Sequence, residues 1–188
     1  VQPPQQAQSA PETEQIATPT AAVAARLTRI HLQLSAASDS DLAELLEEHI
    51  PVFAANAEAQ TLTPGLLRKL QSDIAAILAT EGYFSSQVKF EKSPDETRLD
   101  VEVDAGVRTQ VKEVIFNITG ALMADVQAEK PSAIQRHEKL LKEWGLPRGA
   151  AFRQDDWSKS KTAAMEDLRS LSYAGATLLD SRASIDAE

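Results

Sequence analysis

The sequence predicts an α+β fold of two tandem modules, each with the order β-α-α-β-β and two helices on one face of a small, mixed, three-stranded sheet. Alternating apolar residues mark short strands, and apolar residues at helical spacing mark the helices between them. Similar segments recur at offsets of 84 and 90 residues, which indicates an internal repeat. Charge divides the chain similarly, because residues 26–105 are acidic whereas residues 106–188 are neutral.

Composition excludes several classes of protein. The 188 residues carry a net charge of −9 and include no cysteine, so neither a disulfide scaffold nor a thiol-ligated metal site is expected. No apolar run approaches the roughly 18 residues of a membrane-spanning helix. The acidic balance argues against a nucleic-acid partner, which needs clustered positive charge. The chain does not open on a signal-peptide pattern, so we expect any signal peptide to have been removed.

The first module is expected over residues 26–105, behind a disordered tail at residues 1–25 that is rich in glutamine and proline. Its predicted elements are a strand at 27–34, a helix from Ser38–Asp41 to His49, a loop at 53–60, a helix from Thr63-Pro64 to Gly82, and strands at 85–92 and 98–104. The apolar stripes of these elements define an expected core of Ile30, Leu32, Leu45, Leu46, Leu70, Ile74, Ile77, Val88, Phe90, Leu99, Val101 and Val103.

The second module is expected over residues 106–188. Its predicted elements are a strand at 112–118, a helix from Pro131 to Trp144, a helix capped by Asp155 or Asp156, and a strand at 176–185. No residues remain after Ile185 for a counterpart of the first module's last strand. We therefore expect this module to be C-terminally truncated.

Residue types used in catalysis occur without a catalytic arrangement. His31, His49 and His137 fall in different predicted elements and lack metal-ligand spacing. We interpret Ser158–Lys161 as a helix start with solvated charges rather than a Ser/Lys dyad, and the adjacent Asp155-Asp156 as capping residues rather than an acid–base pair. We predict no catalytic, cofactor-binding or metal-binding residue and no enzymatic activity. A small hydrolase that uses an acidic cluster is the competing hypothesis.

The backbone at a sheet edge is the remaining candidate for binding. An edge strand carries unpaired N–H and C=O groups that can accept an added strand. The strand at 85–92 is the preferred edge, because its apolar residues would cover the core while its charged residues limit aggregation. The predicted partner-binding residues are Ser85, Ser86, Gln87, Val88, Lys89, Phe90, Glu91 and Lys92. The alternative is an edge that is tolerated without binding anything.

Several stretches, taken in order, resemble POTRA domains, the polypeptide-transport-associated modules of the BamA-like superfamily of outer-membrane assembly proteins. These stretches are Ala79–Phe84, Gln87–Phe90, Val103–Val107, Val114–Gly120, Gly145–Gly149 and Asp156–Lys161. The resemblance extends over about residues 26–188. Two features depart from the pattern: Ser172 stands where a glycine before Tyr173 is expected, and the last strand of the second copy is absent.

The resemblance implies a non-enzymatic interaction module, without a cofactor, at the periplasmic face of the outer membrane of a Gram-negative bacterium. Such a module would serve outer-membrane protein assembly or translocation and bind polypeptides partly by strand addition. The implied partners are an inner-membrane-anchored protein, nascent outer-membrane proteins and a C-terminal barrel of the same chain, but not nucleic acid. The alternative function is a rigid spacer that orients the barrel over the inner-membrane-anchored partner, with a role in lipid transport across the envelope.

The resemblance also implies a strand order of 1-3-2, in which the last strand is central. Residues 114–118 and 176–185 would then flank a vacant position in the second module. Unpaired backbone at that position is costly, so we expect one of three outcomes. A strand of a neighbouring chain fills the position, residues 176–188 move into it, or the tail is poorly ordered.

Overall fold

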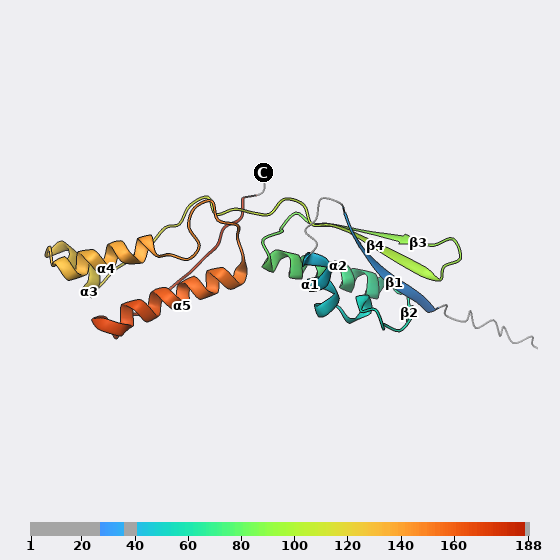
Figure 1. The fold of residues 1–188 in the computed structure, drawn as a ribbon, viewed down its shortest axis with the longest axis horizontal. Coiled ribbons are helices and arrows are strands. Elements are labelled where there is room, and N and C mark those ends of the chain that lie inside the picture. The colour runs from blue at the N-terminus through green and yellow to red at the C-terminus, as the bar shows by residue number, and fades with distance from the viewer. Residues whose placement is uncertain (1–26, 36–40, 187–188) are drawn as a thin grey trace, which may run out of the picture.

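The computed structural model describes residues 27–35 and 41–186. The predicted tail at 1–25 and the cap candidates Ser38, Asp39 and Ser40 lie outside these residues. Figure 1 shows a sheet with its own helices at one end of the chain and further helices at the other. We call residues 27–104 the sheet region and residues 107–186 the helical region. The fold is α+β, as the sequence predicts.

One mixed sheet organises the sheet region, with the strand order β2-β1-β4-β3. Strand β1 (Leu27–Leu34) pairs in parallel with β4 (Arg98–Asp104), and β3 (Gln87–Lys92) pairs antiparallel with the other side of β4. The long strands therefore have the expected 1-3-2 arrangement. A fourth strand, β2 (Gln60–Thr61), which the sequence did not predict, pairs with the start of β1 and begins at the last residue of the predicted loop at 53–60. Two residues are too short a stretch for their alternation to be recognised.

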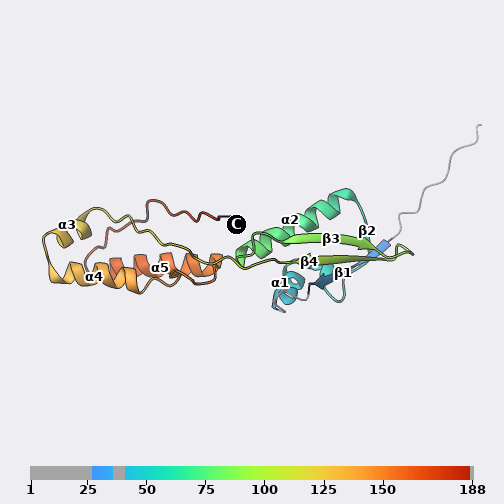
Figure 2. The same ribbon diagram turned by 90° about the horizontal axis from the view of Figure 1, so that it is seen from above.

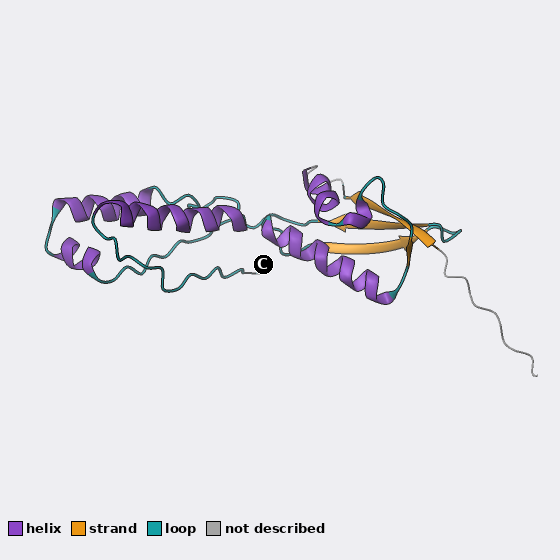
Figure 3. Cartoon of the chain, turned by 90° about the horizontal axis from the view of Figure 1, so that it is seen from below, coloured by secondary structure: helices purple, strands orange, loops and turns teal. Residues whose placement is uncertain are grey.

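Helices α1 (Asp41–His49) and α2 (Pro64–Thr80) lie on one face of this sheet, with the 3-10 turn η1 (Pro51–Phe53) between them (Figure 1). Figure 3 shows both helices from that side, in front of the strands. Helix α2 begins as predicted, because the Thr63 side chain accepts a hydrogen bond from the Leu66 N–H at 3.1 Å and Pro64 follows the cap.

Helix α2 ends in a Schellman motif, in which Gly82 has a positive φ of 92°. The Tyr83 N–H donates to the Leu78 carbonyl at 2.9 Å, and the Gly82 N–H donates to the Ala79 carbonyl at 3.1 Å. These two bonds pair carbonyls that the last turn of the helix would otherwise leave free. The predicted left-handed glycine is therefore confirmed.

Half of the residues of the predicted core are fully buried, and the other half are partly buried. The fully buried members come from the helices and from the central strand β4: Leu46, Leu70, Ile74, Leu99, Val101 and Val103. The half-buried members that pack against them are Ile30, Leu32, Leu45, Ile77, Val88 and Phe90. Strand β4 is paired along its length on both sides, whereas β1 has β2 beside only its first two residues and β3 has a single strand neighbour among the described residues. The cluster also contains buried residues outside the expected core set, namely Leu42, Ile50, Phe53, Leu78, Tyr83 and Ala105.

The helical region differs from its expected β-α-α-β-β pattern. It contains α3 (Ala121–Gln127), α4 (Pro131–Lys142) and α5 (Gln154–Leu171), of which the sequence predicted the last two. Within the described residues, neither 112–118 nor 176–185 forms a strand, and the only ladder contact is an isolated bridge between Gln110 and Ala151. A strand requires a partner, and alternation alone does not supply one.

Helix α5 begins two or three residues earlier than predicted, because the sequence predicted a cap at Asp155 or Asp156. Arg153, with an extended backbone, occupies the N-cap position and makes no side-chain cap bond. Asp155 and Asp156 therefore lie in the first turn rather than at the cap, where their negative charge is still favourable near the helix N-terminus.

The two regions lie end to end rather than side by side (Figure 2). The chain leaves β4, passes Gly106 and enters the helical region without continuing the sheet, because β4 ends at Asp104. Among the described residues, each helix is too short or too polar to cross a membrane.

Candidate polypeptide-binding edge and the joint beside it

Strand β3 lies at the edge of the sheet and has β4 as its only strand neighbour among the described residues. Of the predicted partner-binding residues, Gln87 to Lys92 form this strand, whereas Ser85 and Ser86 precede it. Ser85 sits instead at the exit from β4, where its carbonyl oxygen would be 3.3 Å from a Cβ atom at Gly106.

Backbone hydrogen bonding alternates along β3. The Ser93 N–H donates to the Arg98 carbonyl at 2.9 Å, so this is a hydrogen-bonded pair of the antiparallel ladder. Hydrogen-bonded and non-bonded pairs alternate in such a ladder, so the odd-numbered residues of β3 bond to β4. The N–H and C=O groups of Val88, Phe90 and Lys92 therefore face the free edge. They are available to an added strand.

Strand β3 has one face that packs against the core and one face that is exposed to solvent. Val88 and Phe90 are half-buried and pack against the core, whereas Gln87, Lys89 and Glu91 are exposed. The Lys89 ammonium lies 3.7 Å from the Glu102 carboxylate of β4 in an exposed ion pair. The open edge is therefore polar on its outer face, which limits uncontrolled pairing.

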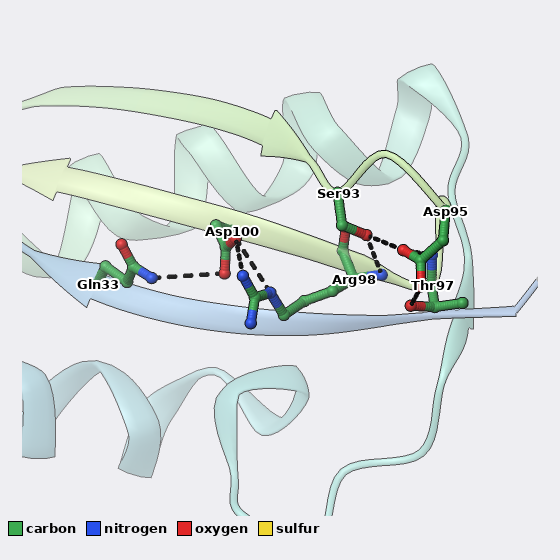
Figure 4. Close-up of polar contacts among 6 residues, drawn as sticks. All are labelled: Gln33, Ser93, Asp95, Thr97, Arg98 and Asp100. Atoms are coloured by element: carbon green, nitrogen blue, oxygen red, sulfur yellow. Dashed lines mark hydrogen bonds and ion pairs between the residues drawn. The ribbon is translucent and has the colours of Figure 1, made fainter.

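The β3–β4 turn is held by the Asp95 carboxylate (Figure 4). It accepts hydrogen bonds from the Ser93 hydroxyl at 2.6 Å, the Thr97 hydroxyl at 2.7 Å and the Thr97 N–H at 3.2 Å. These bonds stabilise the ionised form and lower the pKa of Asp95 to about 2. The turn thereby sets the register of β3 on β4.

Asp100 ties the outer face of the sheet together on the neighbouring strand. The Arg98 guanidinium lies 3.0 Å from its carboxylate, and the Gln33 amide of β1 donates to it at 3.5 Å (Figure 4). Each of these contacts is polar and lies away from the core, so the sheet presents a hydrophilic outer face next to the open edge.

Glu81, at the end of α2, joins the sheet region to the helical region. Its carboxylate receives a bidentate contact from Arg153, at 2.8 Å and 3.2 Å, and lies 3.6 Å from the Arg108 guanidinium. Arg108 also donates to the Glu81 carbonyl at 2.9 Å and lies over the Tyr83 ring, 5.7 Å from its centroid. Glu81 raises the pKa of Arg153 through this hydrogen bond. The Glu81 carboxylate thus pairs with two arginines that follow the sheet region in the chain.

Gly82 makes the closest backbone approach in this joint. A Cβ atom at Gly82 would lie 2.3 Å from the Phe152 carbonyl oxygen, so a side chain there is incompatible with the observed contact. The Thr109 N–H donates to the Gly82 carbonyl at 2.9 Å, and the Phe152 N–H donates to the Thr109 carbonyl at 2.8 Å. The glycine therefore serves two purposes, since it ends α2 and allows the helical region to dock.

Aromatic rings continue the joint toward α5. The ring centroids of Phe84 and Phe152 are 5.8 Å apart, and those of Phe152 and Trp157 are 6.3 Å apart. The Lys161 ammonium lies 3.8 Å from the centroid of the Trp157 ring. The sequence marks Gly82 as a helix end but does not indicate Glu81, Arg108 and Phe152 as joint residues, because no local pattern reveals a contact between distant segments.

Several of the side chains considered for catalysis have local partners. The Ser160 hydroxyl donates to the Asp156 carbonyl at 2.7 Å, and the Lys159 ammonium pairs with Asp155 at 2.5 Å. His49 lies 2.9 Å from the Leu45 carbonyl through its Nδ1 atom. Among the described residues, no three side chains from histidine, aspartate or glutamate gather as a metal site.

Among the comparisons with known proteins, the comparison with solved structures gives a match. No family model matches the chain, and no curated protein matches it. A crystal structure of domains POTRA3–5 of BamA from Haemophilus influenzae is similar to 77% of the chain at 16% identity, with a TM-score of 0.35. The chain matches 50% of that structure's length.

Proposed function

We propose that this chain is a non-enzymatic polypeptide-binding module at the periplasmic face of a Gram-negative outer membrane, and that it binds client polypeptides by strand addition to β3. The free edge of β3 is the observation that carries the proposal, because Val88, Phe90 and Lys92 direct outward backbone groups that no other described residue pairs. Binding of this kind uses the main chain and discriminates side chains only loosely. That suits a module that meets many unfolded clients rich in β-structure.

The finer proposal rests on the sequence stretches that resemble POTRA domains. Within that superfamily they are most similar to TamA, the outer-membrane subunit of the translocation and assembly module. We propose accordingly that residues 26–105 and 106–188 are successive domains of a TamA-like protein, with a C-terminal barrel of the same chain beyond them. Its partners would be a TamB-like, inner-membrane-anchored protein and nascent outer-membrane proteins.

A second candidate function is favoured by the joint. The Glu81 carboxylate forms ion pairs with Arg108 and Arg153. The Gly82 backbone lies so close to the Phe152 carbonyl oxygen that residue 82 has no room for a side chain. A joint of this kind suits a rigid spacer that orients a barrel over its inner-membrane-anchored partner, with a role in lipid transport across the envelope. The two functions are compatible, since one uses the β3 edge and the other uses the end of α2.

Lys92→Pro tests the strand-addition proposal. Lys92 is exposed and its N–H faces the free edge, so proline removes an outward donor without removing a bond to β4. We expect the affinity for a urea-unfolded outer-membrane β-barrel protein, measured by fluorescence anisotropy after dilution, to fall about fivefold, as the loss of one hydrogen bond of about 1 kcal/mol requires.

Lys92→Ala is the matched control, because it removes the same side chain and keeps the N–H. Equal binding by Lys92→Pro and Lys92→Ala would contradict strand addition at β3. Loss of binding in both variants would instead indicate recognition through the lysine charge.

A further inference from the structure

The segment that leads from α2 into β3 also contacts the helical region. Glu81 forms an ion pair with Arg153 at 2.8 Å, and the Phe84 ring lies 5.8 Å from the Phe152 ring, measured between centroids. Strand β3 begins at Gln87, only three residues after Phe84. The residues that hold the helical region are therefore the ones that bring the chain into the edge strand.

The end of β4 reaches the same point of the fold. Gln87 pairs with Asp104, the last residue of β4, so this pair is the end of the β3–β4 ladder at the joint. The Asp104 carboxylate accepts a hydrogen bond from the Gly106 N–H at 3.0 Å, and a Cβ atom at Gly106 would lie 3.3 Å from the Ser85 carbonyl oxygen. The chain thus enters the helical region directly beside the segment that enters β3.

The two ends of the β3–β4 ladder are held in different ways. At the far end, the Asp95 carboxylate holds the turn through Ser93 and Thr97, which all belong to the sheet region. At the near end, the residues that precede β3 have partners in the helical region. Local opening starts where flanking residues lose their contacts. Loss of the helical region's contacts should therefore loosen the near end of β3 and leave the far end closed.

The joint consists largely of ion pairs and backbone hydrogen bonds between regions that lie end to end (Figure 2). The side chains of Arg108 and Arg153 are 32% and 44% exposed, so solvent reaches both ion pairs with Glu81. Relative motion is the normal behaviour of regions that share a small, polar interface. We therefore expect the helical region to dock reversibly.

We propose that docking of the helical region and pairing at the start of β3 are coupled, so that the joint is a conformational device that orders or releases one end of the edge strand. In the docked state Glu81 and Phe84 are held from outside the sheet, and the Gln87–Asp104 pair beside them is closed. In the undocked state that pair opens more often. The coupling involves this chain alone and does not depend on what β3 binds. Because coupling is reciprocal, any ligand that orders the start of β3 would in turn favour docking.

Hydrogen exchange, measured by NMR on the full 188-residue chain without a client, tests the coupling. The Thr109 amide reports docking, since it donates to the Gly82 carbonyl across the joint. The Gln87 amide reports the joint end of β3 and the Glu91 amide its turn end, because the odd-numbered residues of β3 bond to β4. The Val111 amide, which bonds within the helical region, reports the stability of that region.

Arg153→Gln opens the joint from the helical side and leaves every residue of the sheet region unchanged. We expect the Thr109 and Gln87 amides to exchange faster by the same factor, about threefold, because one opening exposes both and the lost ion pair is partly exposed. The Glu91 and Val111 amides should exchange as before.

Lys159→Gln is the matched control. It removes a cation from the same helix, but Lys159 is exposed and pairs with Asp155 within α5 rather than across the joint. This variant should change none of the four exchange rates.

Three results would overturn the proposal. Faster exchange at Thr109 without a change at Gln87 would show that docking and β3 are independent, and an equal rise at Gln87 and Glu91 would show general destabilisation of the sheet region. Gly82→Ala perturbs the joint more strongly, because its Cβ atom would meet the backbone of the helical region. If neither Arg153→Gln nor Gly82→Ala speeds exchange at Thr109 and Gln87, these contacts do not control the start of β3.

Discussion

The sheet region and the helical region carry the same kinds of sequence pattern, but only the sheet region closes around a core. In the sheet region β4 joins β1 to β3, and its inward residues are among the most buried of the described residues. In the helical region Val107, Ile115 and Leu179 remain 83%, 71% and 88% exposed. An alternating segment therefore becomes a strand only when a neighbouring strand satisfies its backbone, and a central strand decides whether its two neighbours pair.

The largest effect expected from this difference is on stability. Ile74→Ala in α2 should lower the free energy of unfolding of the sheet region by about 2–5 kcal/mol, because it leaves a cavity in a closed core. Leu141→Ala in α4 should cost less than half as much, since Leu141 is already 45% exposed and its truncation removes less buried apolar surface. Hydrogen exchange resolves the two regions. Equal losses would show that the helical region is as tightly packed as the sheet region.

A second comparison is between Gly82, which lies in the joint, and Gly149, which has no close neighbour. Gly82→Ala and Gly149→Ala both place alanine at a positive φ, 92° and 84°, which costs about 1–2 kcal/mol each. Only Gly82→Ala also meets the Phe152 carbonyl oxygen, because nothing lies within 4 Å of a Cβ atom at Gly149. We expect Gly82→Ala alone to broaden the distribution of distances between spin labels on α2 and α5. An unchanged distribution would mean that the joint tolerates the side chain by local adjustment.

A smaller effect is expected at the helix starts. Thr63→Ala removes the cap bond to Leu66 and should destabilise the sheet region by about 1 kcal/mol in urea unfolding. Lys130 occupies the corresponding position of α4 without a cap bond. Lys130→Ala should therefore have a weaker effect than Thr63→Ala. The reverse order would show that the exposed Lys130–Asp125 ion pair matters more than a cap.

The smallest effects concern two carboxylates with lowered pKa values. Asp95 owes its pKa of about 2 to neutral hydrogen-bond donors, whereas Asp167 owes its lowered pKa chiefly to Lys139. A carboxylate with a depressed folded-state pKa stabilises the fold above its unfolded pKa, near 3.8. That contribution is lost as pH falls through the folded value, toward 2 for Asp95.

Salt should separate these two carboxylates. NMR titration in added salt should move the pKa of Asp167 upward, because salt screens charge pairs, and leave that of Asp95 nearly unchanged. Equal sensitivity of the two pKa values to salt would contradict this assignment of causes.

The candidate site was predictable to the extent that it is local. Alternation of Val88 and Phe90 with charged residues predicts a strand, and the structure places that strand at an edge. Which residues direct backbone groups to the free edge depends on the β3–β4 register, which the turn at Asp95 sets. The contacts of Glu81 with Arg153 join residues 72 apart in the chain, and no spacing in the sequence indicates them.

Elements whose signals lie within a few residues are predictable from the amino-acid sequence alone. Thr63-Pro64 and Gly82 bound α2, and the period-2 pattern of Leu99, Val101 and Val103 marks β4, because capping, φ preference and side-chain alternation are local properties. Whether an alternating segment becomes a strand depends on its neighbours in space, so residues 27–34 form β1 while residues 112–118 have no backbone partner among the described residues. A strand is completed by hydrogen bonds to another segment, and the free energy of that pairing depends on what lies beside it in space.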